Sequence, residues 1–365
     1  MDKKRDKIYV IAFAVLFFGL AVFAWFKPAD DFSATERRPL EQFPKLNAET
    51  VFNGKFMSEF EEYAVDQFPF RDAFRSVKAV THLYGFGQRD NNDVYMVEGY
   101  VSKLDYPLSE DAMDSAIKKF QSIYNNYIEG TETKVYYSII PDKNYFLAEA
   151  NGYLSYPFES MQAYMETRLL NMQYIDISEL LSLEDFYRTD THWKQENILD
   201  VAYALAEAMG VSLQAEYETV VLDTPFYGVY YGQLGLPIEP DRIAYLNHEL
   251  FQACTIINHE NGQQIPMYRL DKAEGRDPYE MFLSGSLSVI TIENPNATTD
   301  KELVVFRDSF GSSLAPLLVE GYAKITILDA RYLNENMIGN FVSFDKQDVL
   351  FIHSTSVINN KTAFR

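Results

Sequence analysis

The chain has 365 residues, of which 53 are acidic and 32 are Lys or Arg, giving a formal net charge of -21. Because 47% of the residues are hydrophobic, the chain can bury a sizeable core, which excludes a wholly disordered or fibrous protein. The acidic charge argues against nucleic-acid binding, and the single cysteine, Cys254, excludes an intramolecular disulfide and a four-cysteine zinc site.

An uncharged apolar run, Ile8–Phe26, follows a basic start at residues 1–7. A helix of this length spans about 28 Å, close to the thickness of a bilayer's hydrocarbon core. Since the basic residues precede the run, we expect a cytoplasmic tail at 1–7, a transmembrane anchor at 8–26 and an extracytoplasmic remainder. A cleaved signal peptide is the alternative, although its apolar region is usually about 7–15 residues long. The sequence thus predicts a single-pass protein of the cell membrane.

The segment after the anchor divides into a stalk and a helical region. Residues 27–50 carry prolines and mixed charge, which predicts an extended stalk. In residues 51–130, Phe and Tyr recur at helical spacing. This pattern predicts a helical region that packs on the main domain through its aromatic face. Within it, Pro69 should divide the first helical stretch, and a hairpin is expected at 94–104.

From residue 131 to 365, short apolar runs alternate with helical segments, which predicts one α/β domain. We expect a central, mostly parallel sheet covered by helices on both faces. Residues 212–285 interrupt this pattern with Gly, Pro and Tyr, and are interpreted as an inserted irregular or β segment. The expected strands are 135–140, 174–177, 303–306, 325–328 and 349–353, and the expected helices are 157–171 and 194–209.

A serine with catalytic potential, Ser309, lies in the loop 307–311, which directly follows the expected strand 303–306 and precedes an apolar helix. Reactive residues of parallel α/β sheets gather in loops at the carboxyl ends of strands. The free N–H groups of a helix start there favour a developing oxyanion. The alternative is that Ser309 or Asp308 merely caps the helix.

A serine nucleophile needs a base, and His192 is the candidate because Asp190 lies two residues before it. A carboxylate beside an imidazole fixes its tautomer and stabilises its cation. One alternative is a surface turn in which Asp190 caps the next helix, and another is a metal site built on Asp190, His192 and another carboxylate. Since no dense cluster of metal-ligand residues is seen, we expect no metal and no cofactor.

Further candidates for contacts with substrate or with an oxyanion lie beside these loops or at other strand ends. The alternative, for the candidates at the strand ends, is that their side chains are merely solvated or form ion pairs and contact no substrate. The candidates are Phe310, Arg331, Lys143, Asn144 and Trp193.

Five motifs and their order along the chain resemble those of the bacterial DHHW proteins. These proteins look like relatives of the alginate O-acetyltransferases in the SGNH hydrolase-like superfamily. The resemblance runs from about residue 37 to the C-terminus, and it departs from the family pattern at Thr191, where the family has His. The motifs are Asn53-Gly54-Lys55-Phe56, Asp66-Gln67-Phe68-Pro69-Phe70-Arg71, Pro141-Asp142-Lys143, Asp190-Thr191-His192-Trp193 and Arg307-Asp308-Ser309-Phe310.

The resemblance implies a circularly permuted SGNH-like three-layer fold, with Ser309 as nucleophile, His192 as general base and Asp190 as its orienting carboxylate. It also implies an acetyl-serine intermediate and the transfer of acetyl to, or its removal from, hydroxyls of a cell-envelope or secreted polysaccharide. The acetyl supplier would be a multi-spanning membrane acyltransferase. The alternative is a non-catalytic glycan-binding or scaffolding protein, favoured by the tyrosine-rich segment 226–232, whose rings could stack on sugars unless they pack on the main domain.

Overall fold

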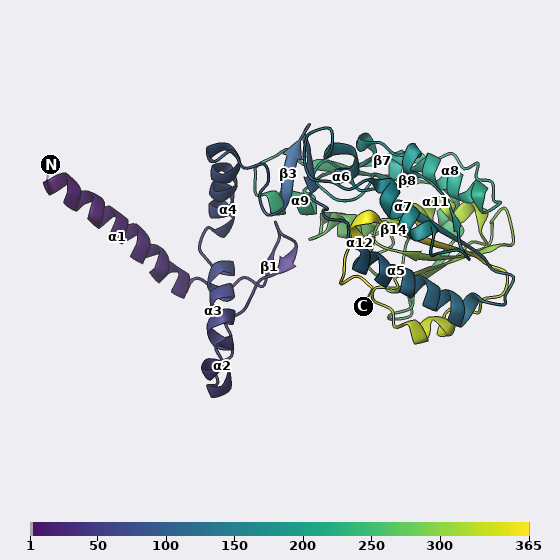
Figure 1. The fold of residues 1–365 in the computed structure, drawn as a ribbon, viewed down its shortest axis with the longest axis horizontal. Coiled ribbons are helices and arrows are strands. Elements are labelled where there is room, and N and C mark those ends of the chain that lie inside the picture. The colour runs from purple at the N-terminus through teal and green to yellow at the C-terminus, as the bar shows by residue number, and fades with distance from the viewer. Residues whose placement is uncertain (1–2, 365) are drawn as a thin grey trace. The chain divides into compact units, whose positions relative to one another are not determined.

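The computed structural model describes residues 3–364 (Figure 1). The chain forms two compact units, an N-terminal unit of Met1–Asn92 with Tyr231–Ile238, and a main unit of Asp93–Tyr230 with Glu239–Arg365. The predicted helical region 51–130 therefore falls partly in each unit.

The N-terminal unit begins with helix α1 (Lys3–Phe26). Its segment Lys4–Phe26 is long and apolar enough to cross a membrane, and none of its most apolar stretch is buried in the protein. The predicted division at Pro69 is present, since it lies between helices α3 and α4. The other elements are strands β1 (Phe32–Ser33) and β2 (Arg38–Pro39), helices α2 (Ala48–Phe52), α3 (Lys55–Asp66) and α4 (Arg71–Val80), and a π-helical turn at Thr81–Gly85.

The aromatic stripe of this unit is not the packed face that the sequence predicts. Phe56 and Phe60 of α3 are half-buried and cluster with Phe43, whereas Phe68 and Phe74 are exposed and contact each other edge to face. The prediction is wrong at Phe68 and Phe74 because helical periodicity identifies an apolar face but not what that face meets.

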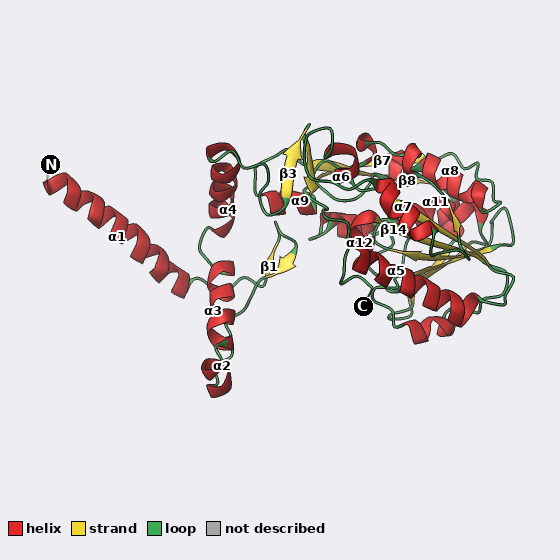
Figure 2. Cartoon of the chain, viewed as in Figure 1, coloured by secondary structure: helices red, strands yellow, loops and turns green. Residues whose placement is uncertain are grey.

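An eight-stranded sheet in the order β10-β9-β11-β13-β12-β14-β5-β6 forms the centre of the main unit (Figure 2). Strands β13, β12, β14, β5 and β6 run parallel, and β11, β9 and β10 extend one edge antiparallel. Their bounds are β5 (Lys134–Ile140), β6 (Gln173–Tyr174), β9 (Thr255–Asn258), β10 (Gln263–Gln264), β11 (Val289–Glu293), β12 (Glu302–Arg307), β13 (Lys324–Leu328) and β14 (Asp348–Ser354).

Helices cover both faces of this sheet (Figure 2). Leu205 of α8 (Leu199–Ala208) and Leu314 of α11 (Gly311–Leu318) share a core with Val305, while Met113 of α5 (Glu110–Ile123) and Met161 of α7 (Phe158–Glu166) share the opposite core with Val304. The neighbouring strand residues Val304 and Val305 point to opposite faces, as a β-strand requires. The predicted α/β fold with a central, mostly parallel sheet is confirmed.

The segment 212–285 contributes to more than one sheet. Strands β7 (Glu218–Phe226) and β8 (Asp241–Asn247) pair with each other, whereas β9 and β10 join the antiparallel edge of the central sheet.

Strands β3 (Val94–Val97) and β4 (Tyr100–Lys103) form the expected hairpin. The remaining elements are helices α6 (Lys143–Leu147), α9 (Val229–Leu234), α10 (Leu250–Ala253) and α12 (Thr355–Ile358), a π-helical turn at Tyr124–Ile128, and 3-10 turns at Ser178–Leu180, Leu183–Asp185, Gln195–Asn197, Leu270–Glu274, Pro278–Met281, Val319–Gly321 and Glu335–Asn340.

Candidate active site

Ser309 lies in the turn between β12 and α11, at the carboxyl end of a central parallel strand. His192 comes from a loop whose ends, Phe186 and Trp193, form an isolated antiparallel bridge. The fold brings these two loops together, and the Oγ of Ser309 lies 2.7 Å from the Nε2 of His192. Ser309 therefore has a partner that can accept its proton.

Asp190 holds the other side of the His192 imidazole. Its Oδ1 lies 2.6 Å from the Nδ1 of His192 and also accepts the backbone N–H of His192 at 3.1 Å. Its Oδ2 accepts the backbone N–H of Val229 at 2.8 Å. Because a carboxylate at Nδ1 favours the proton on that nitrogen, Nε2 is left to accept a proton from Ser309. Asp190 thus takes the place expected for an orienting carboxylate.

The tyrosine-rich segment supports the loop that carries Asp190. The N–H of Gly228 donates to the Oγ1 of Thr189 at 2.9 Å, and the N–H of Tyr230 donates to the Thr189 carbonyl at 3.0 Å. A Cβ on Gly228 would lie 2.2 Å from that carbonyl oxygen, so only glycine fits there. Phe226 and Tyr230 are buried, which favours packing on the main unit over sugar stacking for these two rings.

Tyr279, from the 3-10 turn Pro278–Met281, covers one face of the His192 ring. The ring centroids lie 3.8 Å apart with an angle of 8° between the planes, and the Tyr279 hydroxyl lies 2.7 Å from the Oγ of Ser313 on α11. Sequence reasoning missed this residue, because nothing in the segment around Tyr279 distinguishes it from the other tyrosines of the chain.

Asp308 fixes the turn that presents Ser309. Its Oδ1 accepts the N–H of Phe310 at 3.0 Å, and its Oδ2 accepts the N–H and the hydroxyl of Ser354 at 2.7 and 2.8 Å. Burial opposes ionisation of this carboxyl, but Arg331 and the other favourable interactions offset that cost, so its pKa lies below the ordinary value. Asp308 therefore ties the turn to the end of β14.

Phe310 and Trp193 occupy packing positions beside the histidine. Phe310 was predicted to contact substrate or an oxyanion. Its N–H donates to Asp308, and the centroid of the Phe310 ring lies 4.9 Å from that of the His192 ring. The indole N–H of the fully buried Trp193 donates to the Oγ of Ser313 at 2.8 Å. Trp193 thus links the histidine loop to α11, and Phe310 packs beside the imidazole.

Lys143 and Asn144 lie inside the main unit. The Nζ of Lys143 donates to the carbonyls of Tyr187 and Arg188 at 2.8 and 3.2 Å, and burial lowers the pKa of this ammonium to about 7. The Oδ1 of Asn144 accepts the hydroxyl of Tyr95 at 2.9 Å. Lys143 therefore supports the loop that precedes Asp190, and Asn144 binds strand β3, whereas the sequence had suggested contacts with substrate.

The guanidinium of Arg331, another predicted substrate contact, binds the carboxylate of Asp329. Its Nε and Nη2 donate to the two oxygens of Asp329 at 2.9 and 2.7 Å. The fully buried Arg307 reaches the same carboxylate at 3.5 Å. Asp329, directly after β13, thus binds Arg307 at the end of β12.

An open cleft of about 750 Å³ is connected to the histidine loop through Tyr230, and Asp190, His192 and Ser309 are not among its lining residues. Tyr230 lines it and donates its hydroxyl to the Oγ1 of Thr191, the residue between Asp190 and His192, at 3.2 Å. Polar side chains dominate the remaining wall, including Lys103, Asp105, Glu110, Asp111, Asp142, Asn359, Asn360 and Lys361.

No family model matches the chain, and no curated protein matches it either. Among solved structures, it is similar to a DHHW family protein from Eubacterium siraeum, at 20% identity with a TM-score of 0.62, covering 75% of this chain and 94% of that one. It is also similar to Bacillus cereus PatB1, solved with a sulfonyl adduct, at 16% identity with a TM-score of 0.57, covering 74% and 99%. The O-acetyltransferase domain of Pseudomonas putida AlgJ matches at 13% identity with a TM-score of 0.44, covering 73% and 92%. At these identities the likeness concerns the fold, and the chain therefore folds as the DHHW family protein and PatB1 do, as the resemblance of its motifs predicts.

Proposed function

We propose that the protein is a membrane-anchored, serine-dependent O-acetyltransferase or acetylesterase that acts on a cell-envelope or secreted polysaccharide. The observation that carries this proposal is the chain of contacts from Asp190 through His192 to Ser309, with separations of 2.6 and 2.7 Å. A buried carboxylate, an imidazole and a serine hydroxyl in this order form the arrangement that activates serine in acyl transfer.

In the first half of the reaction, His192 removes the proton from Ser309 as the Oγ attacks the acetyl carbonyl. The tetrahedral intermediate collapses when the protonated imidazole gives that proton to the leaving oxygen, and the acetyl group stays on Ser309. In the second half, an acceptor hydroxyl loses its proton to His192 and attacks the acetyl carbon. The Ser309 oxygen leaves and regains the proton. Water in place of the acceptor gives hydrolysis.

The neighbouring structures support acyl-transfer chemistry. The PatB1 structure with a sulfonyl adduct fits a protein whose nucleophile reacts with an electrophilic sulfonyl group, and an activated serine is such a nucleophile. We infer the same reactivity for Ser309.

The cleft beside the histidine loop is the proposed acceptor site. Its wall carries hydrogen-bonding side chains suited to sugar hydroxyls, such as Asn359 and Asn360. Four carboxyl groups and two lysines line it, and burial raises the pKa of two of these carboxyls, Asp105 and Asp142. The cleft therefore offers both hydrogen-bond donors and acceptors to an acceptor sugar.

The proposed location is the outer side of a cell membrane. Helix α1 would span the bilayer once, with basic residues 1–7 on the cytoplasmic side and the main unit outside. We infer that acetyl groups reach the site from a multi-spanning membrane acyltransferase, since an extracytoplasmic enzyme needs a donor that crosses the membrane.

The direct test uses the detergent-solubilised full chain and a chromogenic acetyl ester. Wild type should release acetate, His192→Ala should be slower by about 10²- to 10⁴-fold, and Ser309→Ala should fall to background. Ser115→Ala, on α5, is the matched control and should keep full activity. Mass spectrometry should find an acetyl adduct on the peptide that carries Ser309. Equal rates for wild type and Ser309→Ala would refute the proposal.

A non-catalytic glycan-binding protein is the second candidate, and the same open cleft favours it. Titration of glycans into Ser309→Ala separates the two functions. Undiminished binding, together with a wild type that releases no acetate, would support the scaffold.

A further inference from the structure

Helix α4 and the turn after it expose their apolar side. We call the side formed by Phe70, Phe74, Val77, Val80 and Tyr84 the outer face. These side chains recur every three or four residues and are 44 to 69% exposed. A surface helix ordinarily turns such a stripe toward the protein core, so the outer face of α4 lacks its usual cover.

The opposite side of α4 carries two arginines, Arg71 and Arg75, which are directed into the N-terminal unit. Arg71 bonds to the carboxylate of Glu36, and Arg75 reaches the same carboxylate at 3.1 Å. Arg75 also donates to the carbonyl of Gly232 at 2.7 Å, and Ala79 beside it is fully buried. Arg71 and Arg75 are thus committed to contacts within the N-terminal unit.

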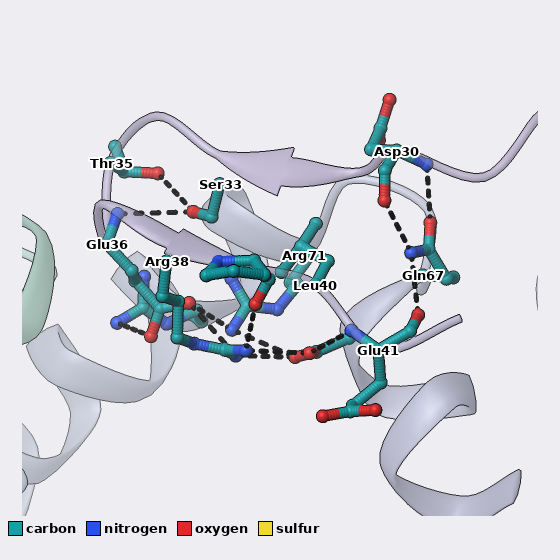
Figure 3. A network of polar contacts seen from close by, with 12 residues as sticks. Asp30, Ser33, Thr35, Glu36, Arg38, Leu40, Glu41, Gln67 and Arg71 are labelled. Carbon is teal, nitrogen blue, oxygen red and sulfur yellow. Dashed lines mark hydrogen bonds and ion pairs between the residues drawn. The ribbon is translucent and has the colours of Figure 1, made fainter. Parts of the chain in front are cut away.

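These ion pairs belong to a wider network that fixes the orientation of α4 (Figure 3). Arg38 donates through two nitrogens to Asp66, at 2.7 and 2.5 Å, and Arg71 approaches the same carboxylate at 3.5 Å. A bidentate guanidinium–carboxylate pair is geometrically restrictive, so the network resists rotation of the helix. Turning the outer face inward would leave several of these charges without partners.

The start of the outer face lies beside the end of α1. The rings of Phe23 and Phe70 stack with centroids 6.0 Å apart and an angle of 20° between planes. The side chain of Gln67 holds the chain that leaves α1, since it accepts the N–H of Asp30 and donates to the Asp30 carbonyl, each at 2.8 Å (Figure 3). Phe23 is one turn from the end of the apolar run, where a membrane-spanning helix meets the headgroup layer.

We propose that the outer face of α4 lies in the interfacial layer of the lipid bilayer, next to the exit point of α1. Interfacial helices place aromatic and aliphatic side chains at the boundary between headgroups and acyl chains and keep their polar side away from it. Continuity with α1 selects the bilayer as the occupant of this face. The inference rests on the membrane anchoring proposed above and is independent of catalysis.

The test places an environment-sensitive fluorophore at single cysteines of the full chain in lipid vesicles, after Cys254→Ser removes the native thiol. Val77→Cys reports on the outer face, Asp72→Cys reports on the polar side of the same helix, and Leu16→Cys reports on α1. Val77 and Leu16 are each 62% exposed, and the Asp72 side chain is 58% exposed, so labelling is matched. Limited proteolysis checks that each variant folds.

We expect lipid-borne quenchers to reduce the fluorescence at positions 77 and 16 severalfold more than at position 72, and aqueous iodide to do the reverse. Quenching by lipid at 16 but by iodide at 77 would overturn this inference and leave the anchor intact. Protection of position 77 from both quenchers would assign the face to a protein partner and would also overturn it. Quenching by iodide at 16 would overturn the anchor along with the inference, whereas the ester assay tests catalysis separately.

Discussion

The ring of Tyr279 lies flat against the imidazole of His192, with centroids 3.8 Å apart and an angle of 8° between the planes. A tyrosine face is electron-rich, so it attracts the imidazolium that forms when His192 takes a proton. The tyrosine hydroxyl lies 2.7 Å from the Oγ of Ser313, which fixes the ring against the same helix that follows Ser309. Tyr279 therefore contacts the proposed base from a segment distant in sequence from the loop that carries His192.

Replacement of Tyr279 should separate the stacked ring from its hydroxyl. Tyr279→Leu loses the aromatic face and should lower kcat/KM for an acetyl ester by about 10- to 30-fold, since a desolvated cation–π contact is worth up to about 2 kcal/mol. Tyr279→Phe keeps the stack and should stay within severalfold of wild type. The reverse order, with Phe worse than Leu, would show that the hydroxyl matters and the stack does not.

Asp190→Asn tests the orienting carboxylate. An amide at this position no longer favours a proton on the Nδ1 of His192, so Nε2 is poorly prepared to accept the proton of Ser309. We expect kcat to fall by about 10⁴-fold with little change in thermal stability. Steady-state kinetics beside a melting curve measures both quantities. A fall in melting temperature that accounts for the lost activity would mean that Asp190 serves the fold alone.

Gly228→Ala tests the support beneath the histidine loop. The added Cβ would lie 2.2 Å from the Thr189 carbonyl oxygen, so the loop must shift, and a displacement of about 1 Å at a catalytic group costs about 10²-fold in rate. Gly130→Ala is the control for backbone strain without a clash, since Gly130 has a positive φ, of 84°, and open space around it. Activity should fall in the first variant and persist in the second. Equal losses would point to backbone strain.

The stability of the main unit should fall between acidic and neutral pH because of Asp142. Burial and the neighbouring Asp105 raise the pKa of this carboxyl from 3.8 to about 7. The folded protein thus keeps a proton that the unfolded chain releases, so this contribution is complete below pH 3.8 and is lost as the pH rises to about 7. Asp142→Asn should flatten this part of the curve, by an amount on the order of a few kcal/mol.

Urea midpoints of the detergent-solubilised protein at pH 4, 5.5 and 7 provide the measurement for Asp142. The amide of Asn can still accept the N–H of Asn144, which bonds to the Oδ1 of Asp142 at 2.9 Å. The variant therefore removes the titration and keeps that hydrogen bond. Parallel curves for wild type and variant would show that the carboxyl does not control this pH range.

The strands that position the site follow from local sequence. Lys134–Ile140, Glu302–Arg307 and Asp348–Ser354 are apolar β-rich runs that lie within a residue or two of their predicted bounds. Strand β11 (Val289–Glu293) lies inside the sheet but was not predicted, because a short apolar run has no periodicity that separates a strand from a buried helical segment.

Which residues line the site was harder to predict than which loops form it. Lys143, Asn144 and Trp193 stand at the right strand ends and loops, yet their polar atoms bind other parts of the protein: the Tyr187 carbonyl, Tyr95 of β3 and Ser313 of α11. Position at a strand end places a residue near the site, but the direction of its side chain depends on packing against segments distant in sequence. Tyr279, in contrast, contacts His192 although no motif in the sequence marks it.

By itself, the sequence determined the apolar N-terminal helix, the alternation of strands and helices, and the presence of a serine, a histidine and an aspartate in loops where parallel strands end. Only the tertiary structure decided that Ser309 and His192 meet, that Tyr279 covers the imidazole, and that α4 turns its apolar side outward. The physical reason is that periodicity and local propensity act over a few residues, whereas the contacts of His192 join loops more than eighty positions apart. The orientation of α4 likewise depends on ion pairs with residues outside the helix.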